Sequence, residues 1–310
     1  MAETIDQNEQ AAEFSAGMAK YGVCFVIPYF GKLPKWFPAF LVSCEYNPQY
    51  DFLILTDAPT PEVHPPNVKF MEYSLQQLND LASSKLDLRI NKEAYAICDL
   101  RPAFGLIFED LLRGYEWWGH CDIDVIFGRL EMLLSPTLLK TQDIISSRRG
   151  AIAGHCTIYR NVERINKLFY NIPGLTKLLC CRTICHVDES HMACLLRTRS
   201  DVRVCWHAQL VVDQRELDLM PFFWRWEKGR VLNRVGHERA YLHFGFWKKT
   251  LRNIDFEYGD EVSSFDITPR GIYSSGTRPI LDRLRVPPFG CFWRVCYAKA
   301  RRILTGRGGL

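Results

Sequence analysis

The chain has 310 residues, of which 47% are hydrophobic, 24% charged and 13% aromatic, and it carries a net charge of +4. These proportions are ordinary for a globular protein and exclude a disordered chain, a collagen-like repeat and a coiled coil. The length allows one large domain or two small ones, with enough chain to bury a substantial core. The charge excess is too small to predict nucleic-acid binding, and we expect no nucleic-acid partner.

Residue types divide the sequence into three parts. Residues 1–20 are rich in Glu, Gln and Ala and are predicted to form a flexible leader, whereas residues 278–310 are aromatic and basic, with a net charge of +7. Residues 21–277 are predicted to form one domain. The leader lacks the apolar core of a signal peptide, and no apolar run is long enough to predict a membrane-spanning helix. Several of the twelve cysteines lie in apolar runs, which favours free thiols and a reducing, cytoplasmic location.

Short apolar runs alternate with helix-like stretches over the first 130 residues. The run from Val23 to Ile27 predicts a buried strand that ends at Pro28, and a later strand is closed by Thr56 and Asp57. This alternation predicts an α/β domain with a mostly parallel sheet flanked by helices. We predict strands at 23–27, 52–55, 68–71, 143–146 and 151–159, and helices at 35–44, 75–81, 93–112 (with Pro102 as a kink or second start) and 162–170.

The sharpest chemical signal is Asp122-Ile123-Asp124, which stands between two apolar runs. On a regular strand the two carboxylates would share one face, and in a turn at a strand end both can converge on one cation. Paired carboxylates in an apolar setting are costly unless a cation neutralises them, and Mn²⁺ or Mg²⁺ bound to phosphate oxygens would do so. The alternative is a turn that carries two solvated aspartates.

A second signal lies at residues 241–249, Tyr-Leu-His-Phe-Gly-Phe-Trp-Lys-Lys. His243 could supply a neutral imidazole to the same metal, and Gly245 would let a ligand approach the backbone closely. Lys248 or Lys249 could reach a phosphate as a point charge. The alternative is an edge strand with a packed histidine and a solvated lysine pair.

A third signal is Asp188-Glu189, at the start of a predicted helix that runs to Leu196. One interpretation is structural, because the helix dipole favours acids in a first helical turn. The other is functional and places one of these carboxylates beside a reacting hydroxyl. Cysteines and histidines surround this pair, but their spacing does not match a paired zinc motif, and metal binding by them stays open. These residues are Cys180, Cys181, Cys185, His186, His191 and Cys194.

Two weaker signals complete the set. Lys92 and Arg101 could hold phosphate, with Asp99 orienting Arg101, and surface ion pairing is the alternative. Gly154, followed by His155, lies within a predicted strand, and a glycine there indicates close approach of a ligand or of another backbone segment.

Taken in chain order, these residues resemble the GT-A fold of nucleotide-sugar glycosyltransferases. The likeness covers about residues 21–249 and is closest to bacterial glycosyltransferase family eight and to uncharacterised relatives with a Cys-Asp-Ile-Asp segment. The resemblance implies a Rossmann-like GT-A domain that moves a hexose from a nucleotide-diphosphate sugar, such as a UDP-sugar. The implied acceptor is a glycan or a lipid-linked sugar in surface polysaccharide or lipopolysaccharide synthesis.

The family pattern also implies a role for each matching residue. Asp122, Asp124 and His243 would bind the Mn²⁺, and Asp188 with Glu189 would face the donor sugar and the acceptor, where an inverting enzyme needs its base. The resemblance favours retention of stereochemistry. The implied donor-binding residues, from the base to the sugar, are Pro28, Tyr29, Asp57, Asp122, Lys248, Gly154 and His155.

Other interpretations fit parts of the sequence. Segment 278–310 interleaves aromatic with basic residues, which suits contact with anionic lipid at a membrane surface, and the alternative is a basic helix packed on the domain. Asp122 could instead be the nucleophile of a haloacid-dehalogenase-like phosphatase, although three predicted strands precede it. A non-catalytic carbohydrate- or membrane-binding relict of the fold is the third possibility.

Overall fold

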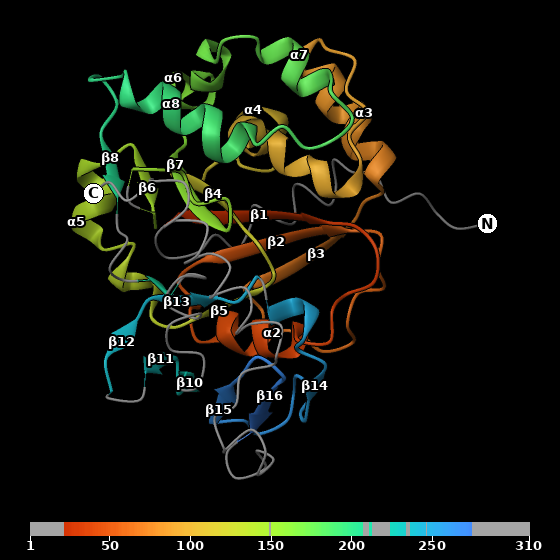
Figure 1. Ribbon diagram of the computed structural model, residues 1–310, viewed down its shortest axis with the longest axis vertical. Helices are drawn as coiled ribbons and strands as arrows, with labels where there is room; N and C mark the ends of the chain where they lie inside the picture. Colours follow the sequence, from red (N-terminus) through yellow and green to blue (C-terminus); the bar gives the residue numbers. More distant parts are fainter. Residues whose placement is uncertain are drawn as a thin grey trace, which may run out of the picture.

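The chain folds around a central sheet whose first four strands in sheet order run parallel (Figure 1). The computed structural model describes residues 22–148, 150–206, 211–212, 224–233, 236–245 and 247–274. Within them, the central sheet has seven strands, and β7 is the strand that runs antiparallel to its neighbours. In sheet order these are β3 (Val68–Glu72), β2 (Asp51–Thr56), β1 (Val23–Tyr29), β4 (Trp117–Cys121), β7 (Cys156–Arg160), β6 (Ile144–Ser146) and β8 (Val204–Trp206).

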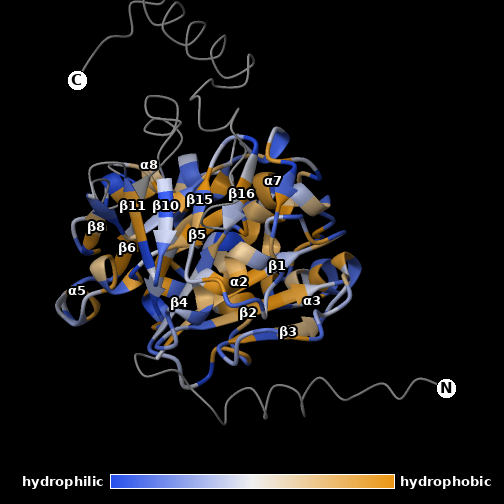
Figure 2. Cartoon of the chain, turned by 90° about the horizontal axis from the view of Figure 1, so that it is seen from below, coloured by the Kyte–Doolittle hydropathy of each residue, from blue (hydrophilic) through white to orange (hydrophobic). Residues whose placement is uncertain are grey.

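The predicted α/β class with a mostly parallel sheet flanked by helices is confirmed. Strand β1 is apolar along its length because both of its faces are covered. Cys24 and Val26 belong to the core under the helices drawn above the sheet, whereas Val23 and Phe25 belong to the core on the opposite face. Hydrophobic residues follow β1 and β2 through the interior, as Figure 2 shows.

Helices cover both faces of the sheet. In Figure 1, helices α3, α4, α6, α7 and α8 lie over one face and α2 lies under the other. Helix α3 begins with a capping box, in which Ser74 accepts from the Gln77 amide and the Gln77 side chain accepts from the Ser74 amide. The α-helices are α2 (Phe37–Glu45), α3 (Leu75–Leu86), α4 (Phe104–Ile107), α5 (Pro136–Thr141), α6 (Glu163–Asn166), α7 (Leu175–Cys180) and α8 (Met192–Arg197).

Two of the predicted helices differ in the structure. The long helix expected over 93–112 is a 3₁₀ helix, η1 (Ala94–Ala103), followed by the single turn α4. Pro102 lies inside this stretch, where it lacks the amide that a continuous α-helix would use. The helix expected over 162–170 is divided into α6 and the 3₁₀ turn η3 (Leu168–Asn171).

Two smaller sheets lie on the same side of the central sheet as α2 (Figure 1). Trp226 of the larger one stacks on Phe265 with ring centroids 4.9 Å apart, and its indole donates to the Phe127 carbonyl at 2.9 Å. This contact fixes β5 and, through pairing, β13. The described six-stranded sheet contains β12 (Glu238–Arg239), β11 (Arg230–Asn233), β10 (Trp224–Glu227), β15 (Ser264–Ile267), β16 (Gly271–Ser274) and β14 (Asn253–Ile254), and the three-stranded one contains β5 (Val125–Phe127), β13 (Tyr241–His243) and β9 (Val211–Val212).

The expected leader, residues 1–20, and the expected basic extension, residues 278–310, lie outside the described residues. Among the helices that the structure describes, none is long and apolar enough to cross a membrane. The cysteines in the described part of the chain are free thiols.

Candidate functional site

Three side chains predicted to bind a metal converge where β4 ends. Asp122 directly follows β4, and Asp124 directly precedes β5. Strand β5 pairs antiparallel with β13, which places His243 opposite Val125, and the Phe244 amide donates to the Asp124 carbonyl at 3.0 Å. One ligand atom from each of the three side chains lies within 4.8 Å of the other two. The pairing of β5 with β13 therefore brings together residues that are about 120 positions apart in the sequence.

Gly245 and Lys248 complete this group. A Cβ atom on Gly245 would lie 2.9 Å from His243 Nε2 and 3.4 Å from Asp124 Oδ2, so a side chain there would crowd the ligand atoms. Lys248 Nζ lies 3.1 Å from Asp124 Oδ2, and the Lys248 side chain is 41% exposed. The tight contact at Gly245 is with side chains of the same group, and Lys248 pairs with Asp124. Approach of a ligand to Gly245 and contact of Lys248 with phosphate stay predictions.

The electrostatics hold Asp124 ionised. Burial by itself would raise the pKa of Asp124, but the charges of His243 and Lys248 outweigh it and the pKa is lowered. Burial by itself would lower the pKa of His243, but Asp124, 3.6 Å away, and then Asp122 raise it. The two carboxylates therefore favour the protonated, positively charged form of His243.

A second charged group adjoins the first through Arg101. One guanidinium nitrogen donates to the Gly154 carbonyl at 2.8 Å and to Asp188 Oδ2 at 3.1 Å, and the other donates to Asp122. Burial raises the pKa of Asp188 to about 6, although Arg101 opposes the rise. Arg101 thus joins the expected metal-binding aspartate to the expected acidic segment, and its other partner is a backbone carbonyl beside the predicted sugar position.

Gly154 is as tightly enclosed as Gly245. A Cβ atom there would lie 2.8 Å from Glu189 Oε1 and 3.1 Å from Asp188 Oδ2. The Gly154 amide donates to Glu189 at 3.3 Å, and Arg148 pairs with the same carboxylate at 3.3 Å. Asp188 is 3% exposed and Glu189 is 35% exposed, so Glu189 is the acid that reaches open space.

His155 supports His243 from behind. The two rings stack with centroids 4.1 Å apart, and His155 Nδ1 shares a hydrogen bond with the Tyr241 hydroxyl at 2.9 Å. Burial, and then the charge of His243, lowers the pKa of His155 well below its usual value, so the ring is neutral. His155 is 7% exposed and packs against the ring of His243.

The residues expected to hold the nucleotide lie at the carboxyl ends of β1 and β2. Pro28 and Tyr29 close β1, and Asp57 follows β2 and accepts from the Gly31 amide at 2.6 Å. Burial raises the pKa of Tyr29, and the charges of Lys248 and Asp124 act on the same hydroxyl. The Tyr29 hydroxyl donates to the Lys32 carbonyl at 3.2 Å, and Asp57 ties together the loops that follow β1 and β2.

The expectation that Lys92 contacts phosphate is corrected by its position. Its side chain is 0% exposed, and its ammonium lies 2.7 Å from Asp99 and donates to the Leu178 carbonyl at 3.0 Å. Asp99 therefore pairs with Lys92, and not with Arg101 as expected. A lysine with an apolar stem is buried here because its charge is fully paired, a circumstance that sequence alone does not reveal.

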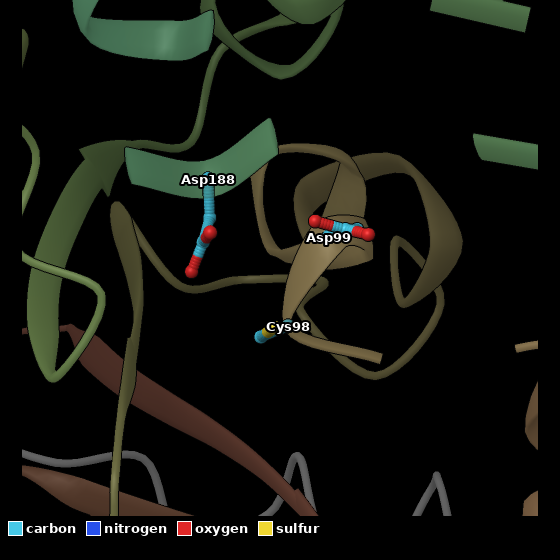
Figure 3. A group of neighbouring side chains, drawn as sticks. All are labelled: Cys98, Asp99 and Asp188. Carbon is cyan, nitrogen blue, oxygen red and sulfur yellow. The ribbon is translucent and has the colours of Figure 1, made fainter. Parts of the chain in front are cut away.

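Asp99 belongs to a second cluster of possible ligand atoms, with Cys98 and Asp188 (Figure 3). The Asp99 carboxylate is already occupied, because Cys185 N donates to Oδ2 at 2.8 Å and Val187 N donates to Oδ1 at 2.9 Å. We interpret Asp99 as an anchor that fixes the turn before Asp188. Among the described residues, the cysteines and histidines at 180–194 form no group of three that could hold an ion.

Sequence reasoning missed the anchoring role of Asp99 and the pairing of Arg148 with Glu189. Neither had a motif, because each partner is distant in the chain: Asp99 and Val187 are 88 positions apart, and Arg148 and Glu189 are 41 apart.

A protein-family model matches residues 25–275, so the chain belongs to this family, which is described as a family of unknown function (DUF6625). No curated protein matches the chain. The match spans the central sheet from the third residue of β1 onward, both smaller sheets and every residue of the site described above.

Proposed function

We propose that this member of DUF6625 is a metal-dependent glycosyltransferase of GT-A type. It moves a hexose from a nucleotide-diphosphate sugar, with UDP-sugars as the first candidates, to a glycan or a lipid-linked acceptor in surface polysaccharide or lipopolysaccharide synthesis. The observation that carries the proposal is the convergence of Asp122, Asp124 and His243 within 4.8 Å, with Lys248 beside them. The family match neither favours nor opposes it.

The residues present fit a hard divalent cation. Two carboxylates and one imidazole form a donor set that Mn²⁺ or Mg²⁺ accepts, with room for phosphate oxygens and water. Gly245 keeps the space beside His243 Nε2 and Asp124 Oδ2 clear of any side chain. When bound, the cation would neutralise negative charge on the leaving nucleotide diphosphate.

Topology supports a nucleotide at this place. Strand order β3-β2-β1-β4 reverses between β1 and β4, and ligands of open α/β sheets bind outside the carboxyl ends of the strands at such a reversal. Tyr29 ends strand β1, and Asp57 and Asp122 directly follow strands β2 and β4 at that edge. The nucleoside would lie against the loops after β1 and β2, which directs its diphosphate toward Asp122 and Asp124.

The surrounding side chains divide the remaining work. Lys248 would turn from Asp124 toward the diphosphate, because its side chain is 41% exposed and has a flexible stem. Arg101 holds Asp122 and Asp188 in fixed orientations. Glu189 is placed to accept a hydrogen bond from a hydroxyl of the donor sugar or the acceptor, whereas the buried Asp188 orients Arg101. This division is compatible with the retaining chemistry that the resemblance favours.

The test is a thermal-shift panel of nucleotide-diphosphate sugars, with and without Mn²⁺, on wild type and Asp124→Asn. A donor at about 100 times its dissociation constant stabilises the fold by about 2.7 kcal/mol. We expect a shift with one nucleotide class that requires Mn²⁺ and is absent from Asp124→Asn. Asp201→Asn is the matched control, because Asp201 pairs with Arg199 at the surface and is 61% exposed.

The donor that shifts the protein is then used, with its sugar labelled, in a transfer assay. Transfer to an acceptor or to water supports the proposal. A folded wild type that binds no donor but releases phosphate from phosphomonoesters would support the phosphatase with Asp122 as nucleophile. Binding of glycan or vesicles without donor binding would support the non-catalytic relict.

A further inference from the structure

Two cysteines flank Thr183 on the loop that joins α7 to the turn carrying Asp188. Cys181 Sγ lies 3.6 Å from Thr183 Oγ1, and Cys185 Sγ donates to the Thr183 carbonyl at 3.7 Å. Both thiols are partly exposed and free. Their sulfur atoms thus converge on one residue at the protein surface, within reach of dissolved reagents.

The two thiols differ in reactivity. Hydrogen bonds from Thr183, and then one with Cys185, lower the pKa of Cys181, whereas burial raises the pKa of Cys185. A thiol with a lowered pKa that is accessible and has a second thiol beside it has the arrangement found in cysteines that oxidise reversibly. This difference favours Cys181 as an attacking thiolate and Cys185 as a resolving thiol.

The loop is tied to the candidate active site at its far end. The Cys185 and Val187 amides donate to the two oxygens of Asp99, at 2.8 and 2.9 Å. Between them His186 has a φ of 58°, a left-handed conformation that is uncommon for residues other than glycine. Asp188 follows directly. A displacement of Cys185 would weaken these two hydrogen bonds and move Asp188.

We propose that Cys181 and Cys185 form a reversible dithiol–disulfide site, which reacts with low-molecular-weight disulfides such as oxidised glutathione and whose oxidation loosens the anchor of Asp188. In the first step the Cys181 thiolate attacks one sulfur of the glutathione disulfide, and one glutathione thiolate leaves. In the second, Cys185 loses its proton to water and attacks Cys181, and the second glutathione leaves. The protein loses two electrons and two protons, and the disulfide of glutathione is reduced to two thiols.

The test is non-reducing tryptic mass spectrometry of the full chain, equilibrated in buffers of increasing oxidised-to-reduced glutathione ratio. Arg182 lies between the two cysteines, so trypsin separates peptide 178–182 from peptide 183–197 unless a disulfide joins them. We expect the joined pair to form in wild type and to be lost in Cys181→Ser and in Cys185→Ser.

Each of these peptides carries a second cysteine, which supplies the matched controls. Cys180 accompanies Cys181 and Cys194 accompanies Cys185, and both Cys180 and Cys194 are exposed. The joined pair should persist in Cys180→Ser and in Cys194→Ser. Its loss in either control, its persistence in Cys181→Ser or its absence from oxidised wild type would overturn the assignment.

Hydrogen exchange tests the link to Asp188. Oxidation should speed exchange of the amides at 185–187 about tenfold, the ratio expected for loss of one hydrogen bond to a charged group. Cys185→Ser should show no change with the glutathione ratio. Unchanged exchange in a fully oxidised wild type would contradict the link. Neither measurement depends on sugar transfer, so the glycosyltransferase proposal and this one can fail separately.

Discussion

Two lysine–aspartate pairs in this protein have the same chemistry but opposite surroundings. Lys92 and Asp99 are both 0% exposed, and the Asp99 oxygens also accept two backbone amides. The Lys248 side chain is 41% exposed, and its partner Asp124, itself 5% exposed, lies 3.6 Å from His243 Nε2. A carboxylate saturated by backbone amides holds a fold in place, whereas one held by side-chain cations can exchange them for a ligand.

The largest effect is expected from breaking the buried Lys92–Asp99 pair. Asp99→Ala leaves the Lys92 ammonium buried without its counter-ion and frees two amides, so the free energy of unfolding should fall by about 3–5 kcal/mol. Denaturant titration monitored by circular dichroism measures the change. A loss below about 1 kcal/mol would show that the Lys92–Asp99 pair is not the anchor inferred from its burial.

The next effect concerns Asp188. Burial raises the pKa of this carboxyl from 3.8 to about 6. A raised carboxyl pKa means that the native state binds the proton more tightly, so this contribution to stability is complete below pH 3.8 and is lost as pH rises through 6. Asp188→Asn mimics the protonated form. Relative to wild type, it should gain up to about 3 kcal/mol between pH 4 and 7. Unfolding curves of both proteins at several pH values measure this, and a constant difference would contradict the account.

A smaller effect is expected in the pH dependence of Mn²⁺ affinity, because His243 lies beside the Lys248–Asp124 pair. The pKa of His243 is raised above 6.5, chiefly because Asp124 outweighs the effect of burial. A metal must displace the His243 proton, so affinity for Mn²⁺ should rise with pH by about tenfold per unit below that pKa. Calorimetric titration in buffers of different ionisation enthalpy should detect one proton released per ion. An affinity that does not vary with pH would remove His243 from the ligand set.

The smallest effect is expected where a carboxylate is neither anchored nor part of the site. Asp201→Asn removes an exposed pair with Arg199 and should leave both the unfolding midpoint and Mn²⁺ affinity unchanged. A marked change in either would mean that loss of any acidic charge, and not the specific surroundings of Asp99 and Asp124, produces the effects above.

Much of the fold could be predicted because parallel strands buried on both faces are continuous apolar runs, as β1 and β2 are. The stretch 93–112 was harder, because its apolar spacing resembles an α-helix while Pro102 and tertiary contacts impose a 3₁₀ conformation. The small sheets had weaker signals, because strands such as β10 have four residues or fewer. Short strands gain their stability from neighbours that are distant in sequence.

The site divides in the same way. The apolar residues on both sides indicated Asp122 and Asp124 as candidate ligands, and Gly245 two residues later indicated His243. Lys92 was predicted to bind phosphate because nothing in the neighbouring sequence indicates that this lysine is buried. Its actual partner, Asp99, is seven residues further along the chain, within the 3₁₀ helix η1. Local pattern identifies what a residue can do, and the fold decides which partner it meets.

The central claim is that Asp122, Asp124 and His243 bind one divalent ion. The most direct measurement is the Mn²⁺ electron paramagnetic resonance signal, which weakens when the free ion binds protein, recorded during titration in the presence of UDP. The account predicts one bound ion per chain for wild type and for Asp201→Asn, and none at the same concentrations for Asp124→Asn. Equal binding by wild type and Asp124→Asn, or no binding by folded wild type, would contradict it.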